Sequence, residues 1–120
     1  MAARARYIFI ASMDVDPAKE DVFNEVYDAE HVPFLLKVPG VLSAKRYKSE
    51  LLTMFIAGRK QTIAAEGEPR YSAVYEIESP EVLTSDAWAK AVDKGRWATE
   101  VRPYLRNRRL VLRKLLDTEG

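Results

Sequence analysis

Three side chains that can move or orient a proton occur close together near the N-terminus. Tyr27, Asp28 and His31 fall within one short segment, and His31 is the only histidine of the chain. A histidine can gain or lose a proton at physiological pH, and a neighbouring carboxylate can fix its tautomer and raise its basicity. Residues four apart share one face of a helix, so a bound molecule could contact both Tyr27 and His31. We therefore expect proton transfer by His31, assisted by Tyr27 and Asp28.

Other roles for His31 remain open. At the C-terminal end of a helix, a protonated histidine interacts favourably with the helix dipole and donates hydrogen bonds to free carbonyl groups, with no catalysis involved. A haem iron could also take His31 as its axial ligand, because one histidine is sufficient for that purpose. The residue type alone does not decide between these roles.

The composition excludes several other kinds of site. The chain has no cysteine, so it forms no disulfide, thiolate nucleophile or cysteine-based metal site, and a single histidine cannot build a histidine-rich metal centre. The sequence also lacks a Gly-x-Ser-x-Gly elbow and any glycine-rich nucleotide-binding loop. We therefore expect no metal, no cofactor and no hydrolase triad.

The charge balance argues against nucleic acid and membrane partners. Nineteen Lys and Arg residues against eighteen Asp and Glu residues leave a formal net charge of +1, which attracts neither phosphate backbones nor anionic lipid. Basic residues concentrate between positions 102 and 114, but no RNA-binding aromatic motif accompanies them. The acidic residues expected to neutralise them are Glu76, Glu78, Glu81 and Glu100. No apolar run is long enough to span a membrane, so we expect a cytoplasmic protein.

Hydrophobic periodicity predicts the elements that position these residues. Apolar and β-branched runs predict strands at residues 7–13, 41–49, 71–77 and 110–116. Asp16-Pro17 and Ser79-Pro80 each predict the start of a helix, because a polar cap followed by proline suits the first turn. Pro33 predicts that the first helix ends or kinks near His31.

The order of these elements predicts a fold. A βαββαβ order is typical of the ferredoxin-like α+β fold, with a four-stranded antiparallel sheet and two helices on one face. The 120 residues suit a single domain, in which residues 50–70 form an ordered insertion of strand extensions or a helical turn. Strands that are apolar on both sides need a second cover, so we expect a homodimer.

The segment from Tyr27 to Pro33, which reads Tyr-Asp-x-Glu-His-Val-Pro, and the Val-Pro-Gly-Val run at 38–41 resemble the EthD-like branch of the dimeric α+β barrel superfamily. Residues 67–83 are also similar to that group. The resemblance implies a ferredoxin-like chain forming a dimeric α+β barrel, with a site at His31. The superfamily includes cofactor-independent monooxygenases, isomerases, cyclases and haem-dependent enzymes, so it implies no particular substrate.

The sequence favours a cofactor-independent enzyme of the isomerase, cyclase, lyase or monooxygenase type. His31 would move a proton on a small apolar or aromatic carbonyl metabolite, and Tyr27 would orient it. The residues expected to contact this substrate are Tyr75, Phe34, Phe9 and Trp88. Two alternatives remain: a non-catalytic small-molecule-binding or accessory dimer, and an interaction dimer that docks on another protein through residues 51–56. Whether the protein is an enzyme at all stays open.

Overall fold

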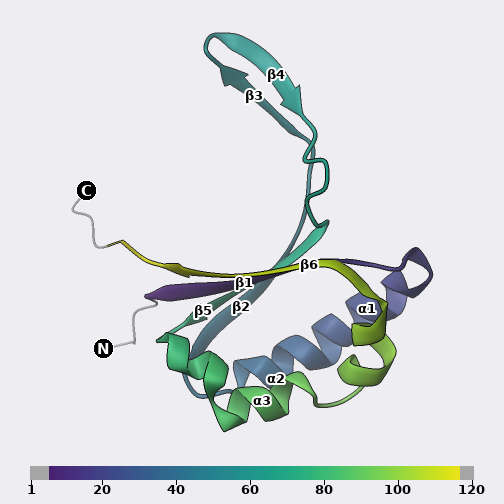
Figure 1. Cartoon of the computed structure of the whole chain (residues 1–120), viewed down its shortest axis with the longest axis vertical. Helices are drawn as coiled ribbons and strands as arrows, with labels where there is room; N and C mark the ends of the chain where they lie inside the picture. Colours follow the sequence, from purple (N-terminus) through teal and green to yellow (C-terminus); the bar gives the residue numbers. More distant parts are fainter. Residues whose placement is uncertain (1–5, 117–120) are drawn as a thin grey trace.

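Four antiparallel strands form the sheet that carries the site. They are β1 (Tyr7–Val15), β2 (Val41–Lys48), β5 (Tyr71–Ile77) and β6 (Leu105–Lys114), in the order β2-β5-β1-β6. In the computed structural model, which describes residues 6–116, the helical segments all lie against one face of this sheet (Figure 1). The predicted ferredoxin-like α+β arrangement is confirmed.

Alternation along β5 decides which side chains face the helices. Every second residue from Tyr71 to Ile77 is buried, and the residues between them are half-buried on the opposite face. The register pairs Tyr75 with Phe9 on β1 and with Ala44 on β2, so these three side chains share the helix-facing side. Tyr75 is only 1% exposed and lies in the middle of the hydrophobic core.

The first helical region begins where the sequence predicts and continues past its proline. Its segments are η1 (Pro17–Lys19), α1 (Glu20–Val26), η2 (Tyr27–His31) and α2 (Val32–Leu36). The Asp16 carboxylate accepts a hydrogen bond from the Ala18 N–H at 3.0 Å, as an N-cap should. Near Pro33, which has no N–H to donate, η2 is a π-helical turn, and the Val32 N–H donates to the Tyr27 carbonyl.

The second helix begins later than predicted. Ser79-Pro80 starts only the 3-10 turn η3 (Pro80–Thr84), and α3 runs from Asp86 to Val92. The Trp88 N–H donates to the Ser85 hydroxyl at 3.1 Å, whereas Ser79 makes no such cap bond. Ser79-Pro80 therefore opens a helical turn as predicted, but the α-helix begins only at Asp86, because the Ser85 hydroxyl is the one that accepts from a free N–H.

The last strand begins five residues before the predicted range of 110–116. Because β6 is an edge strand, its basic side chains reach solvent while its backbone still pairs with β1, and the run of arginines obscured the strand pattern. Two short turns, η4 (Trp97–Val101) and η5 (Arg102–Tyr104), lead into it. The glutamates expected to neutralise the arginines do not do so; the ion pairs formed are Arg102–Asp93, Arg106–Asp16 and Arg109–Glu68.

Residues 50–70 contain a hairpin that projects from the sheet on the side away from the helices (Figure 1). Its strands, β3 (Leu52–Ile56) and β4 (Arg59–Ile63), form a separate two-stranded sheet in which every residue is exposed. Leu52, Met54, Ile56 and Ile63 share one face of this hairpin. No helix among the described residues is long and apolar enough to cross a membrane.

Candidate functional site

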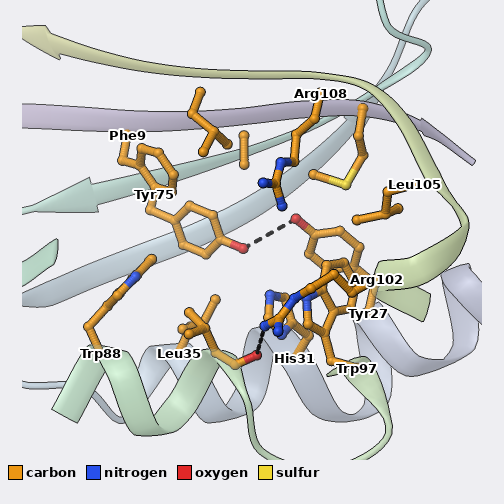
Figure 2. Close-up of a pocket in the computed structure, with 14 residues that line it drawn as sticks. Phe9, Tyr27, His31, Leu35, Tyr75, Trp88, Trp97, Arg102, Leu105 and Arg108 are labelled. Carbon is orange, nitrogen blue, oxygen red and sulfur yellow. Dashed lines mark hydrogen bonds between the residues drawn. The ribbon is translucent and has the colours of Figure 1, made fainter. Parts of the chain in front are cut away.

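A pocket of about 400 Å³ lies between the sheet and the helical layer (Figure 2). Strands β1, β5 and β6 form one wall, and η2, α3 and η4 contribute to the other. Its aromatic lining residues are Phe9, Tyr27, His31, Tyr75, Trp88 and Trp97, and its charged ones are Arg102 and Arg108. The remaining lining residues, all within the described part of the chain, are apolar.

His31 is buried in this wall and is only 5% exposed. Its Nδ1 atom is enclosed and has no hydrogen-bond partner among the described residues, so Nε2 is the nitrogen left to meet a bound molecule. Burial, together with the positive charge of Arg102, lowers the pKa of His31 to about 3. The imidazole is therefore neutral at physiological pH, which excludes the protonated helix-end role.

An ion pair between Glu30 of η2 and Arg96 lies next in sequence to the contact between His31 and Trp97. The Glu30 carboxylate accepts hydrogen bonds from the Arg96 backbone N–H at 3.0 Å and from its Nε at 2.5 Å. Those hydrogen bonds lower the pKa of Glu30. Because Trp97 follows Arg96 directly, this attachment holds the indole against the imidazole, where the two rings stack.

Two tyrosine hydroxyls meet beside the histidine. The Tyr27 and Tyr75 oxygens lie 3.4 Å apart and share a hydrogen bond, although one residue comes from η2 and the other from β5 (Figure 2). Burial raises the pKa of both phenols, so both stay neutral. The π-helical turn brings the Tyr27 ring within 5.2 Å of the His31 ring, edge to face. The pocket thus combines a neutral imidazole with two neutral hydroxyl groups.

Most of the residues predicted for the site line this pocket. Phe9, Tyr75 and Trp88 form an aromatic wall, in which the Phe9 ring stacks on Tyr75 at 5.7 Å and meets Trp88 edge-on at 5.8 Å. Phe34 does not reach this pocket; it lines a separate groove between α2 and α3, where Lys94 lies over its ring. Three of the four residues predicted to contact a substrate therefore line this pocket, and Phe34 does not.

Asp28 lies outside the pocket. Its side chain is 67% exposed, and its carboxylate accepts a hydrogen bond from Arg46 at 2.8 Å. The Arg46 guanidinium lies 4.4 Å from the centre of the Tyr27 ring, so Asp28 helps to hold a cation over that ring. Asp28 was expected to hydrogen-bond to His31. It does not, because its carboxylate binds Arg46 and the Nδ1 atom of His31 has no partner among the described residues.

The lining residues that were not predicted as site residues include one aromatic and two charged side chains, Trp97, Arg102 and Arg108. The two arginines belong to the basic cluster that we expected acidic residues to neutralise. Trp97 lies in an irregular turn, so neither helix nor strand periodicity predicts which way it points. Arg108 is two residues from Leu110 on one strand, so both side chains lie on the same face and line the pocket.

No group of three or more His, Asp or Glu side chains within residues 6–116 could hold a metal ion.

No protein-family model and no curated protein sequence matches the chain. Among solved structures, a protein assigned as an antibiotic biosynthesis monooxygenase from Bordetella bronchiseptica is 18% identical over 94% of this chain and 99% of its own, with a TM-score of 0.65. An EthD family protein from Bacillus halodurans is 14% identical over 92% and 99%, with a TM-score of 0.56. The haem-degrader MhuD from Mycobacterium tuberculosis is 18% identical over 95% and 99%, also at 0.56. The chain therefore has the ferredoxin-like fold of the EthD and antibiotic biosynthesis monooxygenase proteins, as the sequence resemblance predicts.

Proposed function

We propose that this chain binds a small, largely aromatic carbonyl metabolite in the pocket and that His31 moves a proton on it without a cofactor. One observation carries the proposal: a neutral imidazole and two neutral tyrosine hydroxyls meet on the wall of an aromatic pocket. A neutral imidazole can accept a proton, and neutral phenols can donate hydrogen bonds to an oxygen that becomes negative. The similar structures assigned as monooxygenases support an enzyme of this fold.

The simplest reaction is removal of a proton from the carbon next to a carbonyl group. The C–H bond breaks, its electron pair forms the C=C bond of an enolate, and the proton goes to Nε2 of His31 while Nδ1 keeps its own. A hydroxyl of the Tyr27–Tyr75 pair donates to the carbonyl oxygen, where the charge develops. Return of the proton to another atom completes an isomerisation. Asp28 has no part in this step, because it is exposed and bound to Arg46.

Exchange of that proton with solvent tests the role of His31 without knowledge of the natural substrate. Aromatic β-keto compounds and aryl ketones are incubated in D₂O with the protein, and deuterium incorporation is followed by ¹H NMR. Wild-type protein should accelerate exchange for at least one compound, and His31→Gln should lose about 100-fold or more of that rate. Tyr47→Phe, on the opposite face of the sheet, is the matched control. Equal exchange by wild type and His31→Gln would exclude His31 as the base.

A non-catalytic binding protein is the second candidate function. The observation that favours it is the pKa of His31, about 3, because a group that weakly basic is a poor proton acceptor in the empty pocket. The same compounds separate the two functions. Saturable binding to wild-type protein with no deuterium incorporation by any of them supports the binding protein.

Haem is a further candidate ligand, because MhuD has this fold and its structure holds two haems in the active site. In this chain His31 would be the axial ligand through Nε2, since Nδ1 is enclosed by protein. The flat contact of the imidazole with Trp97 restricts how far the ring can turn toward an iron. A Soret band that shifts and sharpens relative to free haemin when the protein is added, and does not do so with His31→Gln, would favour haem over the cofactor-independent reaction.

We also propose that the protein is a homodimer. The sheet face that the helices do not cover carries Ile8, Ile10, Val74 and Val111, which are half-buried in the single chain. The hairpin of β3 and β4 rises on that same side with its own exposed apolar residues (Figure 1). A second copy laid on this face would cover both surfaces, which a two-stranded hairpin needs for stability in water.

A further inference from the structure

The charges around the pocket are unbalanced. Two arginines line it, and none of its lining residues within the described chain is acidic. Arg102 is already compensated, because its Nη2 donates to the Asp93 carboxylate at 2.5 Å and to the Val92 carbonyl at 3.1 Å. Arg108 is not compensated by any of the described residues.

Arg108 differs from the arginines beside it on β6. Arg106 and Arg109 each pair with a carboxylate, on Asp16 and Glu68. Arg108 makes no hydrogen bond or ion pair among residues 6–116. Figure 2 shows its guanidinium pointing into the pocket, in the direction of the Tyr27 and Tyr75 hydroxyls. An unpaired cation therefore faces the place where a bound molecule would lie.

We propose that the molecule bound in this pocket is an aromatic carboxylate, whose anionic group pairs with Arg108. The proposal rests on the proposed function of the pocket as a small-molecule site and names its ligand class. A guanidinium donates two parallel hydrogen bonds to a carboxylate, which leaves the free hydroxyl donor of the Tyr27–Tyr75 pair for a carbonyl oxygen of the same molecule. The rings of Phe9, Tyr75 and Trp88 then cover the aromatic body.

A carboxylate in this position also bears on His31. The positive charge of Arg102 contributes to the low pKa of His31, and a nearby negative charge acts in the opposite direction. A bound carboxylate therefore makes the imidazole a better proton acceptor only when the ligand is present.

The test compares 2-naphthoate with 2-naphthamide, which have nearly the same shape and differ in charge. Binding is measured by calorimetry at low salt and by tryptophan fluorescence, because both tryptophans of the chain, Trp88 and Trp97, line the pocket. Wild-type protein should bind naphthoate about 10-fold more tightly than naphthamide, which corresponds to about 1.4 kcal/mol. Arg108→Gln should remove that preference, because it weakens naphthoate binding far more than naphthamide binding. Arg106→Gln, which alters a neighbouring arginine outside the pocket lining, should keep it.

Two further measurements distinguish loss of the positive charge at Arg108 from a folding defect of the variant. Arg108→Lys retains the charge and should retain part of the preference. Raising the salt concentration should weaken naphthoate binding to wild-type protein and not naphthamide binding. Equal affinity of wild-type protein for both compounds, unaffected by Arg108→Gln or by salt, would overturn the anion assignment while leaving the pocket a small-molecule site. Absence of saturable binding of either compound would instead contradict the proposed function itself.

Discussion

The imidazole of His31 lies flat on the indole of Trp97, with the ring centroids 3.8 Å apart and an interplanar angle of 10°. Residues far apart in the chain form this contact, and the Glu30–Arg96 ion pair beside it holds the two segments together. The stack covers one face of the imidazole and helps to exclude water from Nδ1. Trp97, which lies outside the Tyr27–Pro33 segment, is thus one of the groups that bury the His31 ring.

The first prediction concerns the protonation of His31. Burial lowers its pKa to about 3, so its imidazole signals should not move in an NMR titration of the folded protein between pH 5 and pH 8. Since the chain has a single histidine, the signals need no assignment. A sigmoidal titration near pH 6.5 would show that the imidazole is solvated. Trp97→Ala should raise the pKa, because it uncovers one face of the ring.

The second prediction is a pH dependence of stability. His31 has a lowered pKa in the folded state, so between about pH 6.5 and pH 3 the unfolded chain binds a proton that the folded chain does not. The contribution of this group is full above pH 6.5 and is lost as the pH falls. From pH 7 to pH 5 the free energy of unfolding should decrease by about 2 kcal/mol more in wild type than in His31→Phe. Urea unfolding at both pH values measures this, and equal decreases would contradict it.

The third prediction is that Glu30 positions Trp97. Glu30→Gln removes the charge that holds Arg96, so the Trp97 indole should lose its fixed position and the pKa of His31 should rise. Glu25→Gln is the matched control, because Glu25 contacts the same guanidinium at 3.4 Å from a more exposed position. NMR titration of His31 in the two variants tests this role of Glu30. A higher His31 pKa in Glu30→Gln alone indicates that Glu30 positions Trp97, whereas a loss of stability without a change in that pKa indicates a stabilising role only. An unchanged His31 pKa in Glu30→Gln would refute it.

The fourth prediction concerns the homodimer. Val74 lies opposite Ile10 in the middle of the uncovered sheet face, so Val74→Lys should place a charge in the proposed interface and convert a dimer into a monomer. Leu36→Lys, on the helical side and already 42% exposed, should leave the dimer intact. Light scattering during size-exclusion chromatography measures the mass. A monomeric wild type would contradict the proposal.

The sequence by itself determined the four strands of the main sheet, the two helical regions and the order in which they follow one another. Period-two alternation in residues 71–77 specified β5 to the residue, and Asp16-Pro17 specified the first helical start, because these signals depend on local geometry and capping chemistry. The shared helix face of Tyr27 and His31 was also predictable, since residues four apart lie together on any helix. These features need no knowledge of distant parts of the chain.

The tertiary structure alone decided which chemistry those residues can perform. Trp97, Arg102 and Arg108 reach the pocket only because the chain folds back after α3 and continues as β6 beside β1. Asp28, adjacent to Tyr27 in sequence, is instead drawn to Arg46 on β2. Burial and charge shift the pKa of His31 through groups distant in sequence, and such desolvation exists only once the surrounding segments have packed together.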